Sequence, residues 1–202
     1  LAAAFATMVA LRSGQGQVID ISLLETMFAF MGPLPSVYAL QGEQQPRLGA
    51  GLPYTVPRGT YRCADGRWIA VSTSSDTVAA RVMALLGIGD DERFTTFGGR
   101  AGNRDELEAV MRAWCASRTA DDALAELFAV EAAAGPVMDM AAIAVDPHFL
   151  ARGTIADVDG TPMQALIARL SATPGALRTA GRPMDADGDE IRAHGWENPA
   201  DP

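Results

Sequence analysis

The chain has 202 residues, of which 49% are hydrophobic and 20% are charged, so it can bury a core of its own. The formal net charge is -9 and the Lys and Arg residues form no cluster along the sequence, which excludes the concentrated positive charge of a nucleic-acid-binding protein. Acidity does not exclude an anionic ligand, because a few local basic residues or helix amino termini can hold phosphates.

The apolar runs and the cysteines indicate the cellular compartment. No apolar run reaches the roughly 18 residues that a membrane-spanning helix needs, and no basic segment precedes the first apolar run as in a secretory signal. We therefore expect a cytoplasmic protein with no membrane partner. Cys63 and Cys115 lie far apart and outside any CxxC motif, so we expect reduced thiols rather than a disulfide or a metal site.

Residues 1–12 predict a helix that starts without a capping residue. Leu1, Phe5 and Met8 fall on one face of this helix. A buried helix that lacks a cap indicates further sequence upstream, so we interpret the chain as a fragment of a longer protein.

The next elements predict one edge of an α/β layer. Gly14 is placed to end the first helix in a left-handed conformation. Residues 18–21 (VIDI) predict a short buried strand. Ser22 and Glu25 form a capping box for a helix that runs to about Met31. Helix, strand and helix in this order are typical of an α/β layer.

Five prolines interrupt any regular pattern in residues 33–57. Loops of this length are usually binding loops or crossings between domains, so we place an inter-domain linker at residues 42–58. Gly49, Ala50 and Gly51 are the candidate substrate-binding residues, because glycines beside a small residue let the backbone approach a ligand closely. A merely flexible linker is the alternative.

A smaller α+β unit follows. Residues 59–63 and 68–72 predict a hairpin, with Asp65-Gly66 suited to a type I′ turn. Helical spacing and caps then predict helices at residues 77–86, after Asn103, from Thr119 to Gly135-Pro136, and after Asp146. A second hairpin is predicted at residues 154–158 and 163–167 around Asp159-Gly160, and a short helix at residues 189–193 of the tail.

The residues alone define no reaction. His148 and His194 belong to no recognisable Ser/His/Asp or Cys/His set, and two isolated histidines give no metal site. Residues 14–17 (GQGQ) lie between a helix and a strand, which is the reverse of the order in phosphate-binding loops, so we interpret them as a plain turn.

Several segments over nearly the whole chain resemble the class III CoA-transferases, which include formyl-CoA and carnitine CoA-transferases. Residues 12–25 (RSGQGQVIDISLLE) resemble the family motif R-x-G-x-G-Q-x-V-D-V-S-L-x-E. The other similar segments, in the family's order, are residues 56–68 (VPRGTYRCADGRW), 146–152 (DPHFLAR) and 170–175 (LSATPG).

The resemblance implies an α/β fold of known type. Part of a Rossmann-like large domain is joined to a smaller α+β domain, and two chains form a homodimer of interlocked rings. Residues 1–41 and 168–202 would belong to the large domain and residues 59–167 to the small domain, with the chain as the carboxy-terminal part of the whole enzyme.

The resemblance also implies covalent catalysis, in which an aspartate attacks an acyl-CoA thioester and becomes an aspartyl-CoA before a carboxylic acid takes the CoA. CoA is then a substrate, and no other cofactor is implied. The segment that carries the aspartate in the family lies upstream of residues that match Leu1, so no catalytic residue is assigned in this chain. The glycine loop that closes over the active site in some of these transferases would fall around Gly49 to Gly51, where this sequence is shorter and less rich in glycine.

Two alternatives remain open. The α-methylacyl-CoA racemases share the fold and carry a glutamate in an A-V-G-x-x-E context, where residues 70–75 here read AVSTSS. This difference favours a transferase, because abstraction of an α-proton needs a positioned acid and base. The other alternative is a chain with no catalysis of its own, which serves as an assembly module for a partner that carries the remaining half.

Overall fold

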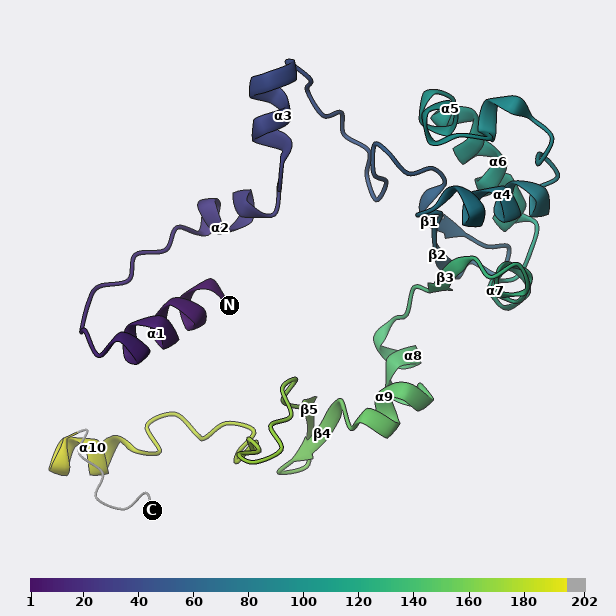
Figure 1. Cartoon of the computed structure of the whole chain (residues 1–202). Helices are drawn as coiled ribbons and strands as arrows, with labels where there is room; N and C mark the ends of the chain where they lie inside the picture. Colours follow the sequence, from purple (N-terminus) through teal and green to yellow (C-terminus); the bar gives the residue numbers. More distant parts are fainter. Residues whose placement is uncertain (196–202) are drawn as a thin grey trace. The chain divides into compact units, whose positions relative to one another are not determined.

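The computed structural model describes residues 1–195 of the chain. The chain divides into two compact units, residues 1–135 and 136–202, and each is described separately. The first unit contains α1 to α7 and β1 to β3, and the second contains α8 to α10, β4 and β5 (Figure 1). The mixed α/β class expected from the sequence is confirmed. The expected linker at residues 42–58 stays a prediction.

Three helices open the first unit: α1 (Ala2–Ser13), α2 (Leu23–Ala29) and α3 (Leu34–Gln41). Gly14 ends α1 with a φ of 71°, as predicted. The Ser22 side chain accepts a hydrogen bond from the Glu25 amide at 3.3 Å, which confirms the cap of α2. None of the three helices has a buried residue, so their apolar side chains face outward.

Two predictions for this region are wrong. Residues 18–21 form no strand, since a strand needs a neighbouring strand to pair with and none pairs with these residues in the described chain. Helix α3 lies within residues 33–57, where we expected no regular structure. Pro35 is tolerated there because it occupies the first turn, in which the amide has no intrahelical partner, and Gly42 ends the helix with a φ of 71°.

The first hairpin joins β1 (Arg58–Arg62) and β2 (Trp68–Ser72), which pair antiparallel with Arg62 opposite Trp68. The hairpin is confirmed, but its turn is not type I′. Only Gly66 has a positive φ, of 82°, and its amide donates to the carbonyl of Cys63 at 3.0 Å. The loop is therefore a tight turn closed by a left-handed glycine, in which Asp65 needs no unusual backbone.

A third strand lies beside β2, and helices precede and follow it in the sequence. Helix α4 (Asp76–Leu85) matches the predicted helix, and α7 (Ala120–Ala129) starts at Thr119 as predicted. However, α7 ends well before Gly135, and β3 (Ala133–Pro136) occupies the residues that we expected to end the helix. Glu131 takes the left-handed position with a φ of 54°, so the usual glycine signal for a helix end is absent.

The core of the first unit lies where α4, α6 (Arg104–Ala116) and α7 gather around β1 to β3 (Figure 1). The largest fully buried apolar side chains are Tyr61, Ile69, Leu107, Met111, Leu127, Val56 and Val82. In the full set of buried residues, Ile69 and Val71 alternate along β2, and Leu107, Met111 and Trp114 recur every third or fourth position on α6, as burial of one face requires.

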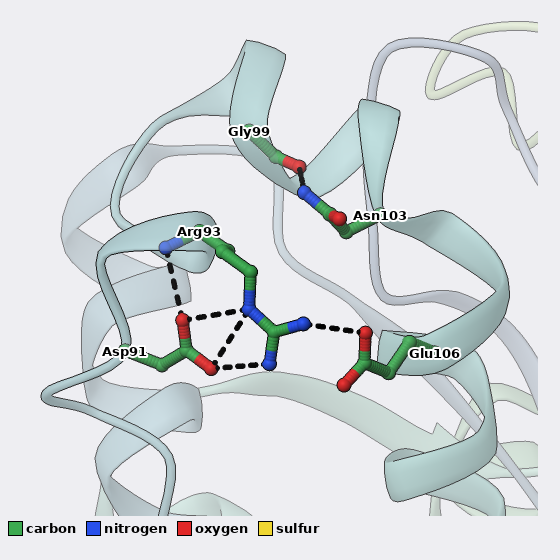
Figure 2. A network of polar contacts seen from close by, with 5 residues as sticks. All are labelled: Asp91, Arg93, Gly99, Asn103 and Glu106. Atoms are coloured by element: carbon green, nitrogen blue, oxygen red, sulfur yellow. Dashed lines mark hydrogen bonds and ion pairs between the residues drawn. The ribbon is translucent and has the colours of Figure 1, made fainter.

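An arginine network joins η1 (Glu92–Phe94) to α6. The Arg93 guanidinium pairs with Asp91 and with Glu106, at 2.7 Å in each case (Figure 2). Asn103 precedes α6 as predicted but does not cap it. Its side-chain amide instead donates to the carbonyl of Gly99 at 2.9 Å, which ends α5 (Phe97–Gly102) (Figure 2).

The second unit contains α8 (Met140–Val145), α9 (Pro147–Arg152), β4 (Ile155–Val158), β5 (Thr161–Gln164) and α10 (Gly188–His194). Asp146 caps α9 through the amides of His148 and Phe149, as predicted. The β4–β5 hairpin is confirmed. Its Asp159 and Gly160 have φ values of 53° and 76°, the pattern of a type I′ turn.

A helix that spans a membrane needs both a length of about 18 residues or more and high apolarity. No single helix between residues 1 and 195 reaches both. Helices α2 and α3 together have the required length and apolarity, but the two helices are bent by 72° relative to each other at the break between them.

The buried thiols predict a loss of stability at alkaline pH. Burial, reinforced by the nearby Cys63, raises the pKa of Cys115 to about 12, and burial also raises the pKa of Cys63. Because the folded pKa lies above the unfolded one, the stabilisation is full below about pH 9 and is lost as the pH rises toward about 12. The free energy of unfolding in urea should fall by up to about 1.4 kcal/mol per pH unit for each such thiol. Cys115→Ala should show a shallower fall, and an unchanged slope would contradict the assignment.

Candidate functional site

The loop that carries the predicted substrate-binding residues is fixed to the start of α6. One guanidinium nitrogen of Arg104 donates hydrogen bonds to the carbonyls of Leu52 and Pro53, the second at 2.9 Å. Two carbonyls on one half-buried guanidinium leave this part of the loop little freedom to move. Leu52 and Pro53 are therefore held against α6.

The loop, the start of β1 and one face of α6 enclose a cavity of about 350 Å³, here called the arginine pocket. Four arginines and two carboxylates line it: Arg47, Arg58, Arg104, Arg112, Asp105 and Glu108. Positive charges thus exceed negative ones by two on its walls. A pocket with this excess attracts an anion.

The structure places two of the three predicted residues on the wall of this pocket. Ala50 and Gly51 line it, whereas Gly49 does not. Gly49 has a φ of 60°, a conformation that favours glycine. A Cβ on Gly51 would lie 3.2 Å from the Leu48 carbonyl oxygen and 3.3 Å from a guanidinium nitrogen of Arg104. Gly49 thus allows the left-handed backbone of the loop, and Gly51 allows the loop to lie close to Arg104.

Glu108 is the central acidic group of the pocket. Its Oε1 accepts hydrogen bonds from the Tyr61 hydroxyl at 3.2 Å and from the Arg58 amide at 3.4 Å. Burial, and then the charge of Glu108, raises the pKa of Tyr61, so this hydroxyl stays protonated and remains a donor to the carboxylate. Glu108 therefore joins α6 to β1 and fixes the backbone from which the Arg58 side chain extends.

The four guanidinium groups have no carboxylate partner of their own in the part of the chain that the structure describes. Within residues 1–195, none of Arg47, Arg58, Arg104 and Arg112 lies within ion-pair distance of an Asp or Glu. Arg104 is engaged with loop carbonyls, which leaves the other three to meet a ligand. An unpaired arginine at a cavity wall is available for a bidentate contact with a carboxylate or a phosphate.

Sequence reasoning did not find this set of arginines. The sequence shows no basic cluster, because the four residues are spread over positions 47 to 112 and belong to a loop, a strand and a helix. The only signal along the chain was the spacing of Arg104, Glu108 and Arg112, which recur every four residues and therefore share one face of α6.

A second hollow of about 420 Å³ adjoins the arginine pocket. Its walls are mostly small residues of the three-stranded sheet and of the loop, including Ala50, Ala70, Ala133 and Ala134. The two cavities share Ala50 and residues 58–60. A ligand with an apolar part and an anionic end can therefore reach from one into the other.

The described residues offer little to a metal ion. Between residues 1 and 195, no three His, Cys, Asp or Glu side chains lie in a group that could hold one. His148 is exposed next to the cap of α9 and His194 is exposed at the end of α10.

Two proteins similar to this chain are named as CoA-transferases. The succinyl-CoA–D-citramalate CoA-transferase of Chloroflexus aurantiacus is 34% identical, over 95% of this chain and 51% of that protein. The succinyl-CoA–L-malate CoA-transferase alpha subunit of the same species is 30% identical, over 90% of this chain and 45% of that protein. The chain thus spans about half the length of these relatives.

Solved structures and the family model agree with these relatives. A CAIB/BAIF family protein from Brucella suis superimposes with a TM-score of 0.75 at 31% identity, over 95% of this chain and 51% of that one. The model of CoA-transferase family III matches residues 1–187. Because this match covers most of the sequence, the chain belongs to CoA-transferase family III.

Proposed function

We propose that the chain is the carboxy-terminal part of an enzyme that moves CoA from an acyl-CoA to a carboxylic acid. The observation that carries this proposal is the family match over residues 1–187. The arginine pocket, which suits an anionic substrate group, supports it. In the proposed enzyme the chain supplies part of a Rossmann-like domain and a small domain, within a cytoplasmic homodimer of interlocked rings.

The proposed reaction proceeds through an aspartate outside these 202 residues. Its carboxylate attacks the thioester carbonyl, and CoA leaves as a thiolate, which gives an acyl–aspartyl anhydride. The thiolate then attacks the aspartyl carbonyl and releases the donor acid, which leaves an aspartyl-CoA thioester. The acceptor carboxylate then attacks the aspartyl-CoA carbonyl and expels CoA as a thiolate, which gives a second anhydride. The thiolate attacks the acceptor's carbonyl in this anhydride, so that the new acyl-CoA forms and the aspartate carboxylate leaves and is regenerated. CoA is the only cofactor-like molecule in this scheme.

The loop at Gly49 to Gly51 has a covering role in this scheme. Its anchor on Arg104 and the close approach at Gly51 allow backbone to lie beside a substrate without a side chain intervening. Excluding water there would protect the anhydride and the thioester from hydrolysis.

Succinyl-CoA is the first donor to test. It stands in the names of the relatives that transfer CoA to D-citramalate and to L-malate. The racemase alternative has less support, since residues 70–75 contain no carboxylate and Thr73 is buried with its hydroxyl bonded to the Pro57 carbonyl at 2.9 Å. No ionisable group is available at that position to exchange a proton.

The proposal is tested by CoA transfer from succinyl-CoA to a panel of carboxylic acids. The assay uses these 202 residues alone and a longer chain that also carries the family's aspartate segment. We expect turnover, and an aspartyl-CoA adduct in the mass spectrum, only in the longer chain. Turnover by the 202 residues alone would place the nucleophile within them and contradict the proposal. Exchange of the α-proton without CoA transfer would favour the racemase.

A further inference from the structure

We propose that Arg104 is a positioning residue of the CoA transfer, which keeps the covering loop (residues 43–53) closed and so excludes water from the reaction intermediates. The inference rests on the proposed function, because it explains what holds the loop that covers the reacting groups. It concerns the position of the loop, whichever acid receives the CoA.

Burial changes along the chain at the point where Arg104 binds. Residues 42–50 are mostly exposed, residues 51–53 are half-buried and residues 55–57 are buried. Arg104 donates its two hydrogen bonds to carbonyls of the half-buried stretch. The exposed part of the covering loop therefore begins where this contact ends, so the contact determines how much of the loop is free to move.

The contact with Arg104 is the attachment of the covering loop within the described residues. No other hydrogen bond between residues 1 and 195 joins this loop to a helix or strand, since its one backbone hydrogen bond only closes a turn inside it. The next attachment along the chain is at Pro57, whose carbonyl accepts a hydrogen bond from the buried Thr73 hydroxyl at 2.9 Å. Loss of the Arg104 hydrogen bonds would therefore free the loop and leave the buried stretch after it in place.

The chemistry of the contact suits a guanidinium. One nitrogen of Arg104 reaches two carbonyls, and the bond to Pro53 measures 2.9 Å. A Cβ on Gly51 would lie 3.3 Å from the other terminal nitrogen, so the absence of a side chain there lets the loop approach. Hydrogen bonds from a charged donor are stronger than those from a neutral one, so this pair can hold a loop that has little other support.

A closed loop matters because both intermediates of the proposed reaction react with water. Attack of water on the aspartyl-CoA carbonyl regenerates the aspartate carboxylate and releases CoA as the free thiol. Attack on the anhydride gives two carboxylic acids and leaves the CoA unesterified. If Arg104 keeps the loop closed, its loss should raise hydrolysis relative to transfer. A general loss of stability would instead lower both rates together.

The first test measures hydrolysis and transfer in the longer chain that is assayed with succinyl-CoA. Arg104→Met keeps an apolar stem and removes the donors, whereas Arg104→Lys keeps the charge and three donors. The ratio of CoA released as free thiol to CoA transferred should rise about tenfold in Arg104→Met and much less in Arg104→Lys. Gly51→Ala crowds the same contact from the loop side, without a positive φ to resist alanine, and should raise the ratio too.

Arg62→Gln is the matched control. Arg62 is exposed on β1 and lies outside the arginine pocket and the adjoining hollow, so its replacement removes the same charge without touching the loop. The ratio of hydrolysis to transfer should stay at its wild-type value in this variant.

The second test needs no CoA transfer, because it uses trypsin on the 202-residue chain. Arg47 lies in the exposed part of the covering loop, and cleavage after it requires the loop to leave the body of the unit. Cleavage at this bond, identified by mass spectrometry, should be about tenfold faster in Arg104→Met than in the wild type. Urea unfolding of each variant shows whether it is folded.

The inference is overturned by any of three results. Unchanged cleavage after Arg47 in Arg104→Met would mean that Arg104 does not hold the loop. Faster cleavage with an unchanged ratio of hydrolysis to transfer would mean that the closed loop does not exclude water. A raised KM with an unchanged ratio would make Arg104 a substrate contact instead. Absence of transfer in the wild-type longer chain is a failure of the proposed function, and the trypsin result, which does not depend on transfer, keeps the two failures apart.

Discussion

Replacing Leu107 with alanine is expected to lower the free energy of unfolding by about 3 kcal/mol. The Leu107 side chain is 0% exposed on α6 and belongs to the buried cluster that joins this helix to the sheet. Its removal deletes buried methyl groups and leaves a cavity that close-packed neighbours fill only in part. Urea unfolding followed by circular dichroism measures the loss.

Leu40→Ala is the matched control for this prediction. Leu40 lies on α3 and is 83% exposed, so the same chemical change removes little buried surface there. We expect a change below about 0.5 kcal/mol. Equal losses at the two positions would mean that Leu107 is not in a close-packed core.

Replacing Asp76 with alanine is expected to cost about 2 kcal/mol, because it leaves a buried charge without its partner. The Arg100 side chain is 1% exposed, and its guanidinium pairs with Asp76 at 2.7 Å and donates to the Phe94 carbonyl at 3.1 Å. The Asp76 side chain is 59% exposed, which keeps the cost below that of a fully buried pair. Urea unfolding gives the value.

Asp121→Ala is the control for the buried pair. Asp121 also lies in the first turn of a helix and pairs with an arginine, Arg67, at 2.9 Å, but both partners are exposed. Surface ion pairs stabilise little, so the unfolding midpoint should not move measurably. The double variant D76A/R100M should recover part of the loss at Asp76. If Asp76→Ala and Asp121→Ala lower the unfolding midpoint equally, then burial of Arg100 does not determine the loss of stability at Asp76.

The sequence by itself determined the features that depend on a few neighbouring residues. The caps at Ser22, Thr119 and Asp146 and the turn at Asp159-Gly160 were predicted and found. Each is set by a side chain that bonds an amide within three residues, or by a residue that tolerates a positive φ. The family was also evident from motifs in the right order.

Tertiary structure decided the features for which the secondary-structure preference of the local sequence was overridden or predicted nothing. Residues 18–21 have a strand-like sequence but no neighbouring strand within the described chain, whereas residues 133–136 become a strand because β2 lies beside them. A strand is stabilised by hydrogen bonds to another segment, and a short sequence pattern does not contain that segment.

The arginine pocket shows the same limit at the level of the site. Of the three residues that the sequence singled out, Ala50 and Gly51 line the pocket and Gly49 does not. Arg58 and Arg112 could not be found, since each looks like an ordinary surface charge along the chain. Only the packing of α6 against β1, with the loop held by Arg104, brings their charges together, because electrostatic attraction depends on distance in space and not on separation in sequence.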